Sequence, residues 1–336
     1  MVVHDGSESS ALAPVLQPES ESMSELYVVT GAGPVGWTIA EQLAEHGHRV
    51  RILTRSGNGP DRVGVERIRA DVSDPEQLKS HAAGAAAVFH CIHGSAYRAR
   101  TWEAQLPQAE QTVMDAAAAA GAVVVFPESL YSYSEPDRLM TEAGPREASG
   151  GKRGVRTALI KGRQAHAADT VSVVAGDFFG PRVRMAHAGE RLVRPILKGK
   201  AVQVIGSADQ PHSFTYVPDL AAAMIAAARE PKLWNSVLHA PTAPPVTMRE
   251  LASAHTTAAR LSQPKLNVVP GWLLRLLGVF STDMREVAEM LYQFERPFVM
   301  DSTASEERLG LRPTSLPEAA AATVAWWRDL EPAAAG

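Results

Sequence analysis

The sequence has little of three features that would each point to a particular class of protein. Its 336 residues include a single cysteine, Cys91, which excludes an intrachain disulfide and a metal cluster built on cysteines. No apolar run reaches the roughly 20 residues that a helix needs to cross a bilayer. The formal net charge of −4 gives no reason to expect a nucleic-acid partner. We therefore expect a cytoplasmic protein without a metal, a membrane span or a nucleic-acid partner.

The composition is ordinary for a globular protein. Apolar residues make up 45% of the chain and charged residues 21%. The length fits a large α/β domain with a smaller second lobe. Residues 1–24 differ from the rest, because they are rich in Ser, Glu and Pro and have no basic start followed by an apolar segment. They predict a disordered tail, and Met23 is an alternative start of translation.

The clearest pattern lies in residues 26–56, which read LYVVTGAGPVGWTIAEQLAEHGHRVRILTRS. The apolar run Leu26–Val29 predicts a strand, and Val35, Ile39 and Leu43 recur every four residues as in a helix. A second strand follows at residues 49–54. The glycine turn between the first strand and the helix predicts a dinucleotide site.

The residues of this turn have separate physical roles. Gly31 permits a tight turn, Gly33 lets backbone N–H groups approach a pyrophosphate, and Gly36 lets the helix pack closely on the sheet. An anion is favoured at the helix N-terminus by unpaired N–H donors and the helix dipole. We predict that Gly31, Gly33, Pro34, Val35 and Gly36 contact the cofactor.

The end of the second strand indicates which dinucleotide binds. NAD-preferring sites place a carboxylate there for the ribose 2′-OH, whereas NADP-preferring sites supply cations for the 2′-phosphate. This chain has Thr54, Arg55 and Ser56 there, and no acid before Asp61. The pattern predicts NADP(H), with NAD(H) as the alternative. Arg55 would contact the 2′-phosphate, and the hydroxyl of Ser56 would donate a hydrogen bond to it. The other interpretation is that Arg55 is an exposed arginine that binds no ligand.

Two later strand ends are expected to line the same cofactor. The third strand, within residues 63–70, is followed by Asp71 and Val72, where a carboxylate could accept the adenine amino group or cap a turn. The fourth strand, residues 85–91, ends at Cys91 over the cofactor. The fifth strand, residues 122–126, leads into a segment rich in hydroxyl groups, residues 127–133. Ligands of open α/β sheets bind outside the carboxyl ends of the strands.

These elements predict an α/β fold with a Rossmann-type doubly wound parallel sheet and a smaller, mainly helical C-terminal substrate lobe. We assign residues 25–177 to the dinucleotide-binding domain, with residues 211–234 returning to it. Residues 178–210 and 235–315 would form the substrate-binding lobe, and residues 316–330 a C-terminal helix. Further helices are expected at residues 107–120 and 155–168.

Together the motifs resemble those of the short-chain dehydrogenase/reductases, in particular the extended or atypical branch called NAD-dependent epimerase/dehydratases. The resemblance spans residues 26–330 and rests on residues 30–36, 71–72, 88–91, 177–181, 216–220 and 247–251. It implies a Rossmann domain that binds NAD(P)H and a C-terminal lobe that closes over the substrate.

The family's catalytic group is a Ser or Thr at the exit of the fifth strand, with Tyr and Lys spaced YxxxK on the next helix. Ser129 matches the serine, and the spacing from residues 179–181 places the lysine at Lys152, a ribose-binding and catalytic residue in the family. The tyrosine position is then Ala148. Aligning Lys161 instead would put Thr157 in that position, so neither alignment supplies the phenol. Tyr131 and Tyr133 leave the same strand end and are the candidates for a replacement donor, or they pack beneath the second lobe.

The leading hypothesis is an NADP(H)-dependent oxidoreductase of a small carbonyl, enone or hydroxyl compound, with Ser129 holding the substrate oxygen and Tyr133 or water completing proton transfer. Trp272 and the leucines after it favour a hydrophobic substrate. The alternatives are a non-redox epimerase, isomerase or cyclase with bound NAD(P), and a non-catalytic NADP-binding sensor. The stripe Val287, Met290 and Leu291 predicts helix packing or a homodimer face.

Overall fold

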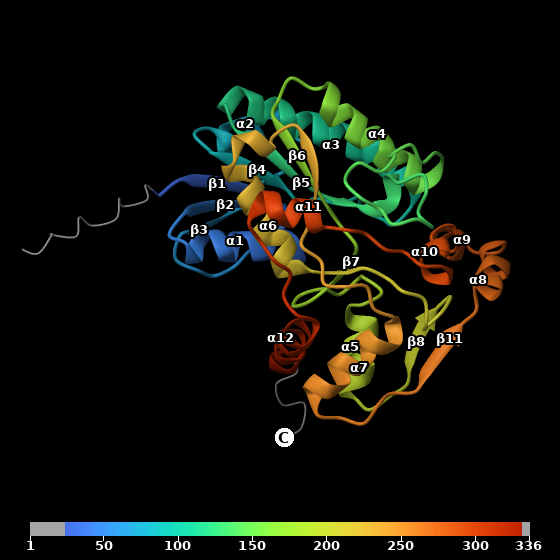
Figure 1. Ribbon diagram of the computed structural model, residues 1–336. Coiled ribbons are helices and arrows are strands. Elements are labelled where there is room, and N and C mark those ends of the chain that lie inside the picture. The colour runs from blue at the N-terminus through green and yellow to red at the C-terminus, as the bar shows by residue number, and fades with distance from the viewer. Residues whose placement is uncertain (1–23, 331–336) are drawn as a thin grey trace, which may run out of the picture.

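A computed structural model describes residues 24–330 of the chain (Figure 1). Within this range seven parallel strands form one sheet in the order β10-β6-β5-β4-β1-β2-β3. The strands are β1 (Leu26–Thr30), β2 (Arg49–Thr54), β3 (Val65–Arg69), β4 (Ala87–His90), β5 (Val123–Ser129), β6 (Thr170–Ala175) and β10 (Ser236–His239). The tail expected over residues 1–24 lies, apart from Ser24, outside the described residues.

Helices cover both faces of this sheet (Figure 1). One face carries α1 (Pro34–Glu45) and α6 (Val217–Arg229), and the other carries α2 (Pro75–Ala82), α3 (Ala99–Ala120) and α4 (Gly151–Ala165). This arrangement confirms the predicted Rossmann-type α/β fold. In the described residues no helix has both the length and the apolar content that crossing a membrane requires.

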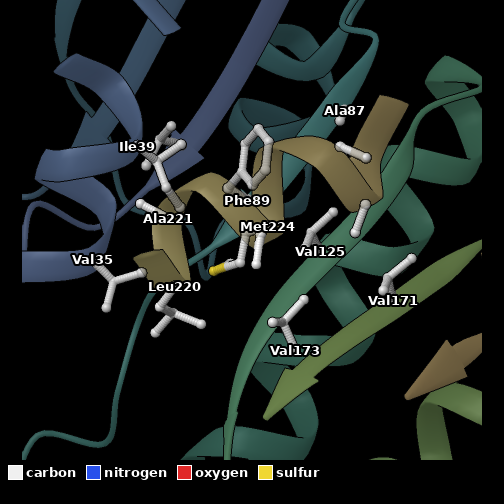
Figure 2. Packing of buried hydrophobic residues seen from close by; sticks show 14 of the residues in the cluster. Val35, Ile39, Ala87, Phe89, Val125, Val171, Val173, Leu220, Ala221 and Met224 are labelled. Carbon is white, nitrogen blue, oxygen red and sulfur yellow. The ribbon is translucent and has the colours of Figure 1, made fainter. Parts of the chain in front are cut away.

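Strand alternation separates the two hydrophobic cores. Because successive side chains of a strand point to opposite faces, Tyr27 and Val29 pack in the core beneath α1 and α6, while Leu26 and Val28 pack toward α2 and α3. Figure 2 shows the first core, where side chains from α1 and α6 meet those of the central strands: Ile39, Leu220 and Met224 lie beside Phe89, Val125 and Val173. The buried strands hold the carboxyl-end loops in place.

The second lobe is built mainly from helices. It contains α5 (Glu190–Leu197), α7 (Met248–Ala259), α8 (Gly271–Gly278), α9 (Thr282–Glu289), α10 (Tyr292–Glu295) and α12 (Leu316–Asp329), with the parallel pair β8 (Val202–Ile205) and β11 (Leu266–Val269). Its core includes Leu192, Val204, Leu251 and Trp327. Between the lobes, β7 (Asp177–Phe179) pairs with β9 (Phe214–Tyr216). Helix α11 (Thr303–Leu309) contacts α6 and β10 of the Rossmann domain. The C-terminal helix α12 therefore packs in the second lobe.

Three boundaries differ from those expected from the sequence. Residues 236–239, assigned to the second lobe, form β10 and pair with β6 at the edge of the large sheet. Helix α3 begins at Ala99, ahead of the expected start at Pro107, which lies inside it. Helix α4 begins at Gly151, so Lys152 lies in its first turn. Of the stripe expected to serve helix packing or a homodimer face, Met290 and Leu291 are buried, as helix packing requires.

Candidate nucleotide and substrate site

The glycine turn leaves an open stretch of backbone at the start of α1. Gly31 adopts φ +92°, a left-handed conformation that favours glycine. A Cβ on Gly36 would collide with the carbonyl oxygen of Gly31, whereas a Cβ on Gly33 would meet no atom within 4 Å. The backbone at Gly33 is therefore open, while Gly36 seats α1 against the sheet. These contacts fit the roles expected of the two glycines.

The start of α1 presents backbone donors beside this opening. Gly33 is the N-cap without a side-chain hydrogen bond to the helix, and Pro34 is its first residue. The side chain of Val35 packs in the core, which leaves only its backbone for a ligand. Cys91 flanks the turn, and its carbonyl oxygen would lie 3.0 Å from a Cβ on Gly31. Burial raises the pKa of the Cys91 thiol, so the thiol keeps its proton at neutral pH.

Arg55 is exposed at the end of β2, in the loop that leads to β3. The loop is closed by Thr54, whose hydroxyl donates to the carbonyl of Asn58 at 3.1 Å, and by Ser56, whose hydroxyl accepts from the Asn58 N–H at 3.4 Å. Asp61 is paired with Arg67 at 3.2 Å, so this first acid after β2 is already engaged. The end of β2 thus presents a cation and hydroxyl groups.

Asp71 lies near this cation, after β3. Its carboxylate accepts the Ser73 hydroxyl at 2.7 Å and the Ser73 N–H at 3.0 Å. These hydrogen bonds, and to a smaller degree the charge of Arg55, lower the pKa of Asp71. Val72 is partly buried against the core of the α2 face. Asp71 therefore caps its own turn.

Ser129 ends β5 above a buried network of charges. Glu128 Oε1 accepts the Ser129 N–H at 2.8 Å and the Ser129 hydroxyl at 3.3 Å. Arg163 Nη1 lies 2.9 Å from Glu128 Oε2, and Arg156 Nη1 lies 3.4 Å from Glu128 Oε1. Burial raises the pKa of Glu128, but the charges of the two arginines outweigh burial and hold this pKa below its usual value. The ionised Glu128 fixes the orientation of Ser129.

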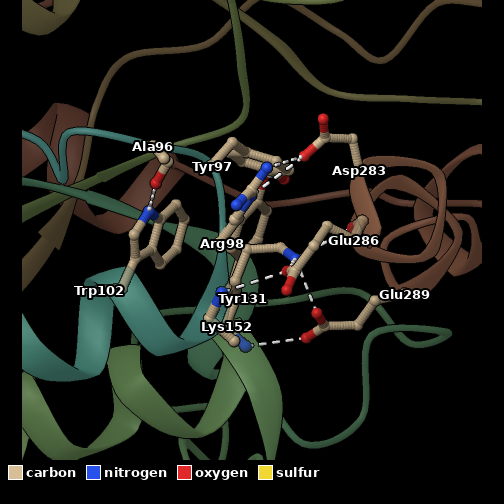
Figure 3. A network of polar contacts seen from close by, with 10 residues as sticks. Ala96, Tyr97, Arg98, Trp102, Tyr131, Lys152, Asp283, Glu286 and Glu289 are labelled. Carbon is tan, nitrogen blue, oxygen red and sulfur yellow. Dashed lines mark hydrogen bonds and ion pairs between the residues drawn. The ribbon is translucent and has the colours of Figure 1, made fainter. Parts of the chain in front are cut away.

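An aromatic cluster adjoins Ser129. Tyr131, in the short 3₁₀ turn η1 (Leu130–Ser132), stacks on Trp102 with ring centroids 6.4 Å apart and an angle of 7° between the rings. Its hydroxyl lies 3.0 Å from the hydroxyl of Tyr97, which follows β4. Figure 3 shows Tyr97 and Tyr131 beside Lys152. The cluster places two phenols at the carboxyl edge of the sheet.

Tyr133, the other replacement donor considered, has its hydroxyl engaged elsewhere. Its ring is buried among Leu130, Phe298 and other apolar side chains. The hydroxyl lies 2.6 Å from His239 Nε2 and donates to the carbonyl of Thr141 at 2.9 Å. Burial raises the pKa of Tyr133 to about 12. This placement favours the packing role over a catalytic one.

Lys152 lies at the start of α4, and its side chain is 0% exposed. The ammonium is paired with Glu286 at 2.5 Å and Glu289 at 2.7 Å, both from α9, and lies 4.9 Å from the centre of the Tyr97 ring (Figure 3). Four residues earlier, Ala148 is buried. Lys161, the alternative lysine, is exposed, and Thr157 donates its hydroxyl to the Ala148 carbonyl. Lys152 is therefore the lysine that lies beside the phenols.

The sequence did not reveal three residues of this arrangement. Tyr97 follows the end of β4, so the rule for ligand sites at strand ends could have suggested it. Glu286 and Glu289 reach Lys152 from a distant helix, and no local pattern marks them. Within residues 24–330 no group of three or more His, Cys, Asp or Glu is arranged to hold a metal ion.

Comparisons with known proteins agree on the fold. The model of the NAD dependent epimerase/dehydratase family matches residues 27–236. The enzyme WbmH of Bordetella bronchiseptica, in complex with NAD+, superposes with a TM-score of 0.71 at 18% identity, over 91% of this chain and 99% of that chain. UDP-glucose 4-epimerase of Thermotoga maritima, with UDP-glucose, superposes with a TM-score of 0.71 at 16% identity, over 91% of this chain and 99% of that chain.

A dehydratase gives a similar result. The DesIV double mutant, a dTDP-glucose 4,6-dehydratase of Streptomyces venezuelae with NAD and DAU bound, superposes with a TM-score of 0.70 at 18% identity, over 91% of this chain and 97% of that chain. The sequences of curated proteins gave no significant match. At these identities the structural likeness shows a shared fold.

Proposed function

Since the chain belongs to the NAD-dependent epimerase/dehydratase family, we propose that it is an NADP(H)-dependent oxidoreductase acting on a small, hydrophobic carbonyl, enone or hydroxyl compound. The observation that carries the cofactor preference is the end of β2. Arg55 is exposed there, and the first following acid, Asp61, is paired with Arg67. A cation at this strand end suits the 2′-phosphate of NADP(H), and the nearby carboxylate of Asp71 accepts the hydroxyl and the N–H of Ser73.

The chain's own residues supply the rest of the cofactor site. The open backbone at Gly33 and the N-terminus of α1 would bind the pyrophosphate, and Ser56 would add a hydroxyl beside Arg55. Lys152 would hold the nicotinamide ribose. Bound NADP(H) supplies hydride exchange at its nicotinamide ring.

The substrate would lie at the exit of β5. Ser129, oriented by Glu128, would hold the substrate oxygen, and the hydroxyl of Tyr131, paired with that of Tyr97, would donate or accept the proton. The exposed ring of Tyr97 and the partly buried ring of Tyr131 offer apolar surface, with the buried Trp102 packed behind them, which supports a hydrophobic substrate. By contrast, Trp272 and Leu276 of α8, expected to favour such a substrate, are exposed.

Calorimetric titration with NADPH and NADH tests the cofactor preference. We expect NADPH to bind more tightly, and Arg55→Asp to weaken NADPH binding about tenfold or more, because a charge-assisted contact is replaced by repulsion. The control is Arg308→Asp, which reverses an exposed charge on α11. Equal affinity for both nucleotides would contradict the NADP preference, and no binding of either would contradict the oxidoreductase.

The family description also includes epimerases, so a non-redox epimerase, isomerase or cyclase that retains bound NAD(P) is the second candidate. A screen that follows both NADPH absorbance and product mass separates the two. A product isomeric with its substrate, with no net change in NADPH, would favour the second candidate.

A further inference from the structure

Lys152 makes as many hydrogen bonds as its ammonium group can donate. Its Nζ lies 2.5 Å from Glu286 Oε2, 2.7 Å from Glu289 Oε2 and 2.9 Å from the carbonyl oxygen of Glu286. An ammonium has three N–H donors and no acceptor. Because the side chain is also 0% exposed, no donor of Lys152 is left for a ligand in this conformation.

All three acceptors belong to α9. Asp283, Glu286 and Glu289 are spaced three residues apart, so they lie along one side of the helix. Asp283 pairs with Arg98 at 2.8 Å, and Glu289 Oε1 accepts the backbone N–H of Lys152 at 2.8 Å (Figure 3). One acidic face of α9 is thus held against the start of α3 and the start of α4.

Little apolar burial holds α9 in this position. None of the eight residues in the described helix is buried. Beside it, α8 exposes Trp272 and Leu276, and Phe280 in the turn between the two helices is 84% exposed. The contacts of α9 with Lys152 and Arg98 are polar, and the buried Met290 and Leu291 anchor the chain directly after the helix. Release of α9 would therefore be a local movement ahead of this anchor.

We propose that α9 is an autoinhibitory latch that competes with the dinucleotide for Lys152. This inference rests on the proposed function, in which Lys152 holds the nicotinamide ribose. A ribose hydroxyl that accepts a hydrogen bond from Lys152 must replace one of the three acceptors on α9. By thermodynamic linkage, the nucleotide weakens the docking of α9 by the same factor by which docking weakens nucleotide binding.

The double variant Glu286→Gln/Glu289→Gln tests this competition. Both substitutions keep the shape of the side chain and remove its charge, so the docked state would bury the Lys152 ammonium without a counter-charge, which is strongly unfavourable. We expect the released state to gain population, and the apparent Kd for NADPH to fall on the order of tenfold. We also expect faster amide hydrogen exchange at residues 282–289 without nucleotide.

In the unmodified protein, saturating NADPH should speed exchange at the same amides. The charge-matched control is Asp137→Asn/Asp209→Asn, which removes two exposed ion pairs with Arg296 and Arg249 and should change neither affinity nor exchange. If the double variant does not fold, Asp283→Asn takes its place. We expect it to lower the apparent Kd for NADPH and to speed exchange at residues 282–289, both by less than the double variant, since the ion pair of Asp283 with Arg98 is exposed.

Three results would overturn the latch. Weaker NADPH binding by the double variant, unchanged binding, or slower exchange of α9 on adding NADPH to the unmodified protein would each show that α9 does not compete with the nucleotide. If no variant binds NADPH or NADH, the proposed function fails. In that case, amide hydrogen exchange measured without nucleotide still tests whether the ion pairs with Lys152 hold α9. Unchanged exchange at residues 282–289 in the double variant would show that these ion pairs do not hold the helix.

Discussion

The hydroxyl groups of Tyr97 and Tyr131 lie 3.0 Å apart. Tyr97 follows β4 and Tyr131 follows β5, and these strands are neighbours in the sheet. Burial, with a further contribution from the charge of Asp177, raises the pKa of Tyr131 to about 12, so this phenol carries its proton at neutral pH. In the proposed function this pair would supply the proton donor, although residue 148 is an alanine.

Tyr131→Phe should lower kcat/KM about 100-fold or more, the usual contribution of a general acid or base. Tyr97→Phe should have a smaller effect of the same sign, because it removes the partner hydroxyl and not the donor. Steady-state kinetics with NADPH, after a substrate is found, measure both.

Tyr133→Phe is the matched control for this test. We expect it to leave kcat unchanged and to lower the free energy of unfolding by about 1–3 kcal/mol, because its hydroxyl satisfies buried partners such as His239. Full activity of Tyr131→Phe, or loss of kcat in a folded Tyr133→Phe, would contradict the assignment.

Alanine substitutions at Gly33 and Gly36 should separate binding from folding. Gly33→Ala places a methyl group in open space, so we expect an unchanged melting temperature and at least about tenfold weaker nucleotide binding, because the methyl blocks the approach of the phosphates. Gly36→Ala pushes α1 away from the Gly31 carbonyl and should destabilise the fold by about 1–3 kcal/mol. Thermal melts and calorimetry measure both. Unchanged nucleotide affinity in Gly33→Ala would contradict the predicted site.

The buried His90 should make stability depend on pH. Burial, aided by the charge of Arg163, lowers the pKa of His90 to about 3, whereas a histidine in the unfolded chain titrates near 6.5. Between these values the unfolded chain binds a proton that the folded protein does not. The contribution of neutral His90 is therefore complete above about pH 6.5 and is lost as the pH falls, at about 1.4 kcal/mol per pH unit.

His90→Asn keeps a polar group that can hydrogen-bond the Thr30 hydroxyl. It should reduce the slope of the free energy of unfolding against pH by about 1.4 kcal/mol per pH unit. Urea unfolding between pH 7 and pH 4 measures the slope, and the difference between the two proteins isolates His90 from other groups that titrate there. His46→Asn, at an exposed position, is the control. Identical slopes for the unmodified protein and His90→Asn would show that His90 is not held neutral.

Local patterns predicted the elements whose signals are contained in a short stretch. The strand, glycine turn and helix of residues 26–45 follow from apolar periodicity and from conformations that only glycine adopts easily, and the structure confirms them. The short strand β10 carried no such signal, because four residues are too few to show a period, and only its pairing with β6 identifies it. The assignments of Arg55, Ser129 and Lys152 stay predictions until ligands are tested.

The sequence by itself determined the Rossmann-type fold, the family and the position of the glycine turn, because these depend on spacing between near neighbours. Only the tertiary structure decided which groups surround the candidate catalytic residues. Glu286 lies 134 residues from Lys152 in the chain, and Tyr97 lies 34 residues from Tyr131. The contact of Glu286 with Lys152 depends on how the second lobe packs against the Rossmann domain, and the contact between the two tyrosines depends on the pairing of β4 with β5. Neither can be deduced from the spacing of near neighbours.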